Sequence, residues 1–143
     1  MQQVYKIFVY GSLRSGFKSL AYNYISKYFT LVNNAKVQGL LYNVNGTPIA
    51  KPTAENKFIV GELYQVNNMD EFGFAMAQID DYEGVNVEEG ERALYRREKV
   101  SVYQENLDNT TAWIYWFNGE VANAPIIESG DVLQFIIDKQ NGL

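Results

Sequence analysis

The sequence predicts an α+β fold: a small, mostly antiparallel curled sheet or barrel with two flanking helices. Aromatic residues make up 15% of the 143 residues, which favours a strand-rich core. Several short segments are rich in β-branched and aromatic residues and are bounded by turn signals, and one segment carries the capping signals of a helix. We expect one domain over residues 1–143, since domains cluster around about 100–150 residues.

The expected elements follow in chain order. The first strand runs from Val4 to Tyr10 and ends at Gly11, and a helix follows around Lys18 to Tyr28. Asn45-Gly46 is a strong hairpin signal, and 106–109 is a weaker one. The remaining strands are expected over Ala35 to Val44, Phe58 to Val66, Leu94 to Tyr103, Thr111 to Phe117 and Val132 to Ile137.

The second helix is expected from about Met69 to Tyr82. Asn68 can cap its start, with Glu71 three residues further on as in a capping box. Gly84 lies where a residue of left-handed conformation is favoured at a helix end. These signals bound the helix on both sides.

Acidic residues gather at the end of this helix. A helical wheel places three apolar side chains on one stripe, namely Phe72, Met76 and Ile79. Glu83 falls on the same stripe, whereas Asp81 points to the opposite side and Asp80 lies at the edge. Glu83 is therefore the one acid of the three that we expect to face the core.

The position of Glu83 suits acid–base chemistry. The negative end of the helix dipole and partial burial both disfavour an ionised carboxyl and raise its pKa. The chain has no His and no Cys, so a carboxyl tuned in this way is a natural general acid or base. Two structural interpretations stay open: an ion pair between Glu83 and Arg96 or Arg97, and a frayed helix end.

The segment from Val9 to Gly16 joins the first strand to the first helix. Such loops expose backbone N–H groups at a helix start, and they bind anions. The segment differs from a nucleotide phosphate loop because Phe17 separates Gly16 from Lys18. Taken alone, a strand followed by Gly and Ser is also compatible with an ordinary tight turn.

Composition excludes several classes of function. A net charge of −5 without a long basic stripe disfavours nucleic acid as a partner. No run approaches the length of a membrane span, and the first residues lack the apolar region of a leader, so we expect a cytoplasmic protein with no membrane partner. The absence of Cys and His removes disulfides, zinc sites of the usual kinds and thiol nucleophiles.

Four ordered motifs give the chain a family resemblance. The segment from Phe8 to Arg14, FVYGSLR, resembles the [FY]-x-Y-G-[ST]-L-[RK] signature of gamma-glutamylcyclotransferase-like and AIG2-like proteins. The three others are VGELY from Val60, IDDYEG from Ile79 and YRREKVSV from Tyr95. The chain departs from the family pattern at Ile49, which separates Pro48 from Ala50, and it lacks the family's G-x-x-N-H run.

The resemblance implies a gamma-glutamylcyclotransferase-like fold and a cofactor-independent lyase or acyltransferase. A small gamma-glutamyl amine or peptide would close on itself to 5-oxoproline, and Glu83 would be the catalytic acid/base. The implied substrate-binding residues are Tyr10, Gly11, Ser12 and Leu13. Tyr95 and Arg96 are possible pocket residues, for which barrel packing and surface pairing are equally open.

Two other functions stay open at this point. One is a domain of the same fold that binds a small ligand without turning it over, and the other is an interaction protein with an exposed apolar patch. The sequence identifies neither the leaving amine nor the oligomeric state.

Overall fold

The structure is a computed structural model that describes residues 4–11, 14, 20–85, 93–105 and 108–142, without the side chains of residues 20 and 21. Within these residues, seven strands form a closed five-stranded barrel and a separate hairpin. The barrel order is β1-β5-β2-β6-β7, antiparallel throughout except that β7 pairs with β1 in parallel. The barrel strands are β1 Lys6–Val9, β2 Phe29–Gln38, β5 Phe58–Val66, β6 Tyr95–Gln104 and β7 Thr110–Phe117. The hairpin pairs β3 Leu40–Val44 with β4 Thr47–Lys51.

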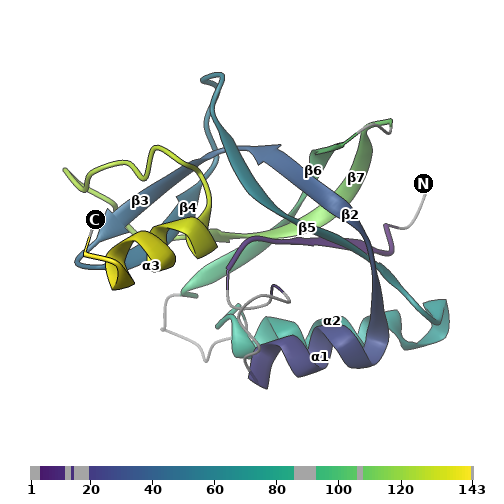
Figure 1. The fold of residues 1–143 in the computed structure, drawn as a ribbon. Coiled ribbons are helices and arrows are strands. Elements are labelled where there is room, and N and C mark those ends of the chain that lie inside the picture. Colours follow the sequence, from purple (N-terminus) through teal and green to yellow (C-terminus); the bar gives the residue numbers. More distant parts are fainter. Residues whose placement is uncertain (1–3, 12–13, 15–19, 86–92, 106–107, 143) are drawn as a thin grey trace.

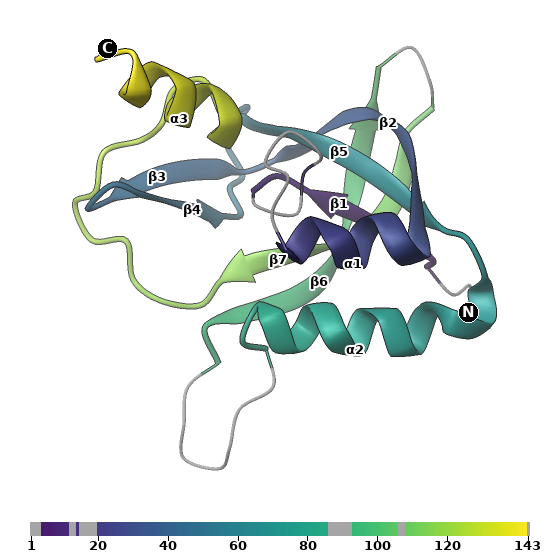
Figure 2. The ribbon, with the colours of Figure 1, turned by 60° about the horizontal axis from the view of Figure 1, so that its bottom comes forward.

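The helices cover two different parts of the barrel. Helix α1 (Leu20–Tyr28) and helix α2 (Phe72–Tyr82), which the short 3₁₀ turn η2 (Met69–Glu71) precedes, lie side by side along the barrel wall (Figures 1 and 2). Helix α3 (Val132–Gln140) lies apart from them, beside the β3–β4 hairpin (Figure 1). None of the helices in the described residues is long and apolar enough to cross a membrane.

Strand β1 is buried on both faces, and its side chains point alternately into two separate parts of the core. Ile7 and Val9 face one cluster of buried side chains, which includes Ile25 of α1 and Met76 of α2. Phe8 points the other way, into a second cluster inside the barrel that extends to α3. Because successive side chains of a strand point to opposite faces, one short apolar strand joins the barrel interior to the helix layer.

The α+β class, the barrel and most of the expected elements are confirmed. Strand β5 has the predicted bounds, and the expected second helix ends at Tyr82, followed by Gly84 with φ +70°. The first helix also ends as predicted, although its expected start at Lys18 lies outside the described residues. Asn45 and Gly46 both have positive φ, 54° and 90°, as a tight hairpin turn requires. The 106–109 turn joins β6 to β7, and residues 106 and 107 are not described.

The C-terminal segment was wrongly predicted as a strand. Val132 to Ile137 belongs to α3, which gives the described residues three α-helices rather than the expected two. The Asp131 side chain accepts hydrogen bonds from the backbone N–H groups of Leu133 and Gln134, at 3.0 and 3.2 Å. This N-cap fixes the first turn of the helix and outweighs the strand preference of the apolar run.

The expected strand from Ala35 to Val44 is two strands. The first begins at Phe29, directly after α1, and the chain breaks at Gly39, whose N–H donates to the Lys57 carbonyl at 3.0 Å. A Cβ atom at Gly39 would lie 2.7 Å from the end of the Ile59 side chain and 3.2 Å from the Lys51 carbonyl oxygen, so the break passes close to neighbouring chain. Strand β4, which the prediction did not include, then returns along β3.

Candidate active site

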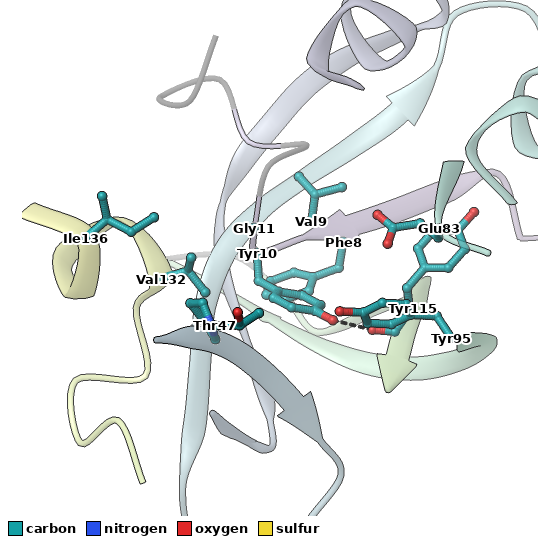
Figure 3. Close-up of a pocket in the computed structure, with 11 residues that line it drawn as sticks. Phe8, Val9, Tyr10, Gly11, Thr47, Glu83, Tyr95, Tyr115, Val132 and Ile136 are labelled. Carbon is teal, nitrogen blue, oxygen red and sulfur yellow. Dashed lines mark hydrogen bonds between the residues drawn. The ribbon is translucent and has the colours of Figure 1, made fainter. Parts of the chain in front are cut away.

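A cavity of about 260 Å³ opens where the end of β1 meets β6, β7, the end of α2, the hairpin and α3. Glu83, Tyr95 and Tyr115 gather at one end of the cavity, Val132 and Ile136 of α3 lie at the other, and Tyr10 stands between them (Figure 3). The full lining consists of Phe8, Val9, Tyr10, Gly11, Thr47, Pro48, Glu83, Tyr95, Tyr115, Val132 and Ile136. The cavity thus has a polar end and an apolar end.

Glu83 reaches the cavity because α2 ends immediately before it. Its backbone N–H closes the last helical turn on the Ile79 carbonyl at 2.9 Å, and Gly84 then turns the chain away from the helix axis. The Glu83 side chain lies on the side of the helix that carries the buried residues Met76 and Ile79. The apolar stripe of the helix therefore ends in a carboxyl at the cavity wall.

Burial raises the pKa of Glu83 to about 7. Among the described residues no cation forms a salt bridge with it, because both candidate arginines have other partners. Arg96 pairs with Glu98 at 2.7 Å, and Arg97 pairs with Asp80 at 2.8 Å. The structural ion pair that the sequence left open for Glu83 does not form.

Tyr10 and Tyr95 border Glu83 as neutral phenols. The pKa of Tyr10 is raised well above its usual value, first by burial and then by the nearby Tyr95 and Glu83. Burial and Glu83 likewise raise the pKa of Tyr95 to about 12. The Tyr10 hydroxyl donates to the backbone carbonyl of Tyr115, which fixes the ring across the middle of the cavity.

Gly11 borders the cavity directly after β1. A Cβ atom added there would meet no atom of the described residues within 4 Å, so a side chain at this position would extend into open space. Neither space nor backbone conformation among the described residues demands glycine here, and the missing side chain leaves the Gly11 backbone accessible from the cavity. This is the arrangement by which a backbone approaches a bound molecule closely.

The predicted site residues are only partly brought together. Glu83, Tyr10, Gly11 and Tyr95 all line the one cavity. Arg96 does not, since its Nη1 donates to the Phe117 carbonyl and the Asn118 side chain at 3.3 and 3.1 Å, and the structure therefore assigns it to surface pairing. Ser12 and Leu13 lie outside the described residues.

The position of Asp80 differs from the one predicted from the sequence. The helical wheel placed it at the edge of the stripe, yet only 7% of it is exposed. Its carboxylate accepts two hydrogen bonds from the Arg97 guanidinium, at 2.8 and 3.1 Å, and one from the Tyr115 hydroxyl at 2.7 Å. The two-residue spacing of Tyr95 and Arg97 on β6 is the sequence signal that both face this helix.

A second contact that sequence reasoning missed joins the loop after β1 to α3. The buried Arg14 forms a salt bridge with Asp131 at 2.8 Å, and Asp131 is also the N-cap of α3. The Arg14 backbone N–H donates to the Gly11 carbonyl at 2.9 Å. The helix that supplies the apolar end of the cavity is thereby held to the turn that supplies Gly11.

Within the described residues, no three carboxylates gather as a metal site would require. The ionisable lining of the cavity among these residues consists of one carboxyl and three phenols. Such a set can accept a proton, return it and donate neutral hydrogen bonds.

Residues 7–134 match the family model described as gamma-glutamyl cyclotransferase, AIG2-like. A Methanocaldococcus jannaschii protein named "putative gamma-glutamylcyclotransferase" is 30% identical over 125 residues, covering 87% of this chain and 92% of that protein.

Solved structures share the fold at lower sequence identity. YkqA of Bacillus subtilis superposes with a TM-score of 0.70 at 20% identity over 97% of this chain, which spans 43% of that longer protein. An AIG2-like protein from mouse superposes with a TM-score of 0.64 at 18% identity, covering 89% of this chain and 88% of the mouse chain.

Proposed function

The chain belongs to the AIG2-like gamma-glutamyl cyclotransferase family, and we propose that it converts a gamma-glutamyl amine or peptide to 5-oxoproline and a free amine. Family membership indicates a cyclotransferase-like function. The finer assignment, with Glu83 as general acid and base, is supported by one observation. The Glu83 carboxyl has a pKa of about 7, has no salt-bridge partner among the described residues, and shares a cavity with Tyr10 and Gly11.

The proposed reaction is an intramolecular acyl transfer. The ionised Glu83 takes a proton from the substrate α-ammonium, and the freed amine attacks the γ-carbonyl carbon. A C–N bond forms to close the five-membered lactam, and the C–N bond to the leaving amine breaks. Glu83 returns this first proton to the leaving nitrogen and takes the second proton from the ring nitrogen. That second proton departs with the released amine as its ammonium, so the carboxylate ends as it began. A pKa near the working pH suits both halves of this exchange.

Positioning is the second contribution proposed for the cavity. The nucleophile is already tethered to the electrophile, so the protein has mainly to hold the chain of the substrate in a closed conformation. We assign the backbone around Gly11, Ser12 and Leu13 to the substrate carboxylate or to the reacting carbonyl oxygen. Tyr95 offers a neutral hydroxyl donor, because its raised pKa keeps it protonated near neutral pH, whereas Tyr10 donates its proton to the Tyr115 carbonyl and lines the pocket.

The test is a panel of gamma-glutamyl compounds assayed for 5-oxoproline, with leaving groups that include amino acids, a lysine ε-amine, cysteinylglycine and simple amines. Formation of 5-oxoproline by the wild-type protein and its loss in Glu83→Gln are expected. If the wild-type protein binds a member of the panel in calorimetry and releases no 5-oxoproline, the domain is a binder of the same fold. If no member either binds or reacts, the proposal fails.

A further inference from the structure

Three residues before Glu83, Asp80 lies at the centre of a polar cluster and does not itself line the cavity. Its Oδ1 atom accepts from both Arg97 Nε and the Tyr115 hydroxyl, and its Oδ2 atom accepts from Arg97 Nη2. The Arg97 guanidinium also stacks on Trp113, with 4.5 Å between its central carbon and the ring centroid. The cluster therefore holds one cation and one phenol in defined positions.

Tyr115 borders Glu83, and Arg97 contacts the residue one helical turn before Glu83. Residues three apart at a helix end are neighbours, with roughly 5–6 Å between their Cβ atoms. Tyr95, two residues before Arg97 on the same face of β6, lines the cavity with Glu83. Tyr115 lines the cavity too, yet its hydroxyl is donated to Asp80.

We propose that Asp80 is a positioning residue for the site: it holds the Arg97 guanidinium and the Tyr115 hydroxyl, so that neither engages Glu83. A guanidinium beside a carboxylate stabilises its ionised form strongly and would leave Glu83 a weak base. Asp80 supplies a competing carboxylate in a forked, two-bond geometry that a single contact to Glu83 would not match. The proposal rests on the proposed function for the task of Glu83, whereas the contacts of Asp80 stand without it.

The surroundings of Glu83 contain no other described charge that would mask this effect. The titratable groups that face it are Tyr10 at the end of β1, Tyr95 on β6 and Tyr115 on β7, all phenols of raised pKa. The hairpin and α3 contribute Thr47, Pro48, Val132 and Ile136 to the lining, and none of these titrates. Arg97 is thus the cation that Asp80 holds one helical turn before Glu83.

The experiment follows the Glu83 carboxyl directly by ¹³C NMR titration of glutamate-labelled protein without substrate, with Glu83→Gln to assign the signal. Asp80→Asn keeps the size of the side chain and an acceptor for Tyr115, but releases the charge of Arg97. We expect the pKa of Glu83 to fall by about 1–3 units, as for a carboxyl beside a guanidinium. Arg97→Met leaves Asp80 as an unpaired anion, and we expect the pKa of Glu83 to rise by about one unit.

The double variant, Asp80→Asn with Arg97→Met, is the matched control. It removes both charges, and we expect the pKa of Glu83 to return to within about half a unit of the wild-type value. A merely structural role would loosen the helix end in both single variants and shift the pKa of Glu83 downwards in each. Shifts of the same sign in the two single variants, or a double variant displaced as far as Asp80→Asn, would overturn the proposal.

If one single variant does not fold, the sign of the other and the return in the double variant still decide the question. Replacing both members of a buried ion pair is usually better tolerated than removing one. In active protein, the acid limb of kcat/KM against pH should move with the NMR pKa in each variant. The titration needs no turnover, so a wild-type protein that forms no 5-oxoproline would refute the proposed function and leave this inference to its own test.

Discussion

Two carboxyl groups three residues apart at the end of α2 have opposite surroundings. Asp80 is 7% exposed and accepts three hydrogen bonds, two of them from a guanidinium. Glu83 is less deeply buried, has no salt-bridge partner among the described residues, and has its pKa raised to about 7 by burial. The comparison shows that the supply of partners, rather than depth of burial, separates a structural carboxylate from one available for proton transfer.

The first prediction concerns turnover, which Glu83→Gln should largely abolish. The amide keeps the shape of the side chain and cannot accept a proton, so turnover should fall by roughly 10²–10⁴-fold while binding largely survives. Steady-state kinetics of 5-oxoproline formation measure both effects. Asp81→Asn is the control because Asp81 is exposed on the same turn, and an equal loss there would move the chemistry away from Glu83.

Asp80→Asn should break the comparison on the structural side. Removing one charge of a buried ion pair leaves the other uncompensated, and we expect a loss of about 3 kcal/mol in the free energy of unfolding. Urea denaturation measures this loss. Asp81→Asn should cost at most about 1 kcal/mol, because Asp81 is exposed. A comparable effect of the two substitutions would show that the Asp80–Arg97 pair adds no stability. Asp80→Asn is therefore unsuitable as a neutral control, although the helical wheel places Asp80 at the edge of the stripe.

The pH dependence of stability should show the same contrast between Glu83 and Asp80, with a smaller effect than the two substitutions above. The pKa of Glu83 is about 7 in the folded protein against an ordinary value of 4.5, so between these values the folded chain keeps a proton that the unfolded chain has lost. Stability therefore falls as the pH rises through this window. We therefore compare the free energy of unfolding of Glu83→Gln with that of wild type at each pH. From acid to slightly alkaline pH this difference should shift by about 2 kcal/mol in favour of the variant, a value reduced to allow for the partial exposure of Glu83. Urea titrations at several pH values measure the gain, and a constant difference would refute the raised pKa.

Local signals in the sequence were sufficient for much of the fold. Strand β5 follows from its β-branched and aromatic run, the hairpin turn follows from Asn45-Gly46, and the end of α2 follows from Gly84. The prediction of a strand over Val132 to Ile137 was wrong, because an apolar run is compatible with both helix and strand. The decisive signal is the Asp131 cap, which lies one residue before the run.

The site was predictable only where one element carries the information. The apolar stripe on α2 predicted the side to which Glu83 points. The junction between the first strand and its glycine predicted that Tyr10 and Gly11 line the site. The wheel could not place Asp80, because its burial depends on Arg97 and Tyr115 from strands that the helix sequence does not encode. Of the possibilities left open for Arg96, the structure supports surface pairing, since neighbouring residues of β6 face opposite ways.

The salt bridge between Arg14 and Asp131 also affects the order in which the site is built. It joins residues 117 positions apart, and the apolar wall that α3 supplies comes after nearly all other elements in the chain. During synthesis from the N-terminus, the residues around Glu83 can therefore pack before the cavity has its far wall. A nascent chain stalled before Asp131 would carry the proposed proton-transfer residue and an incomplete cavity, so ligand binding would report the completion of folding.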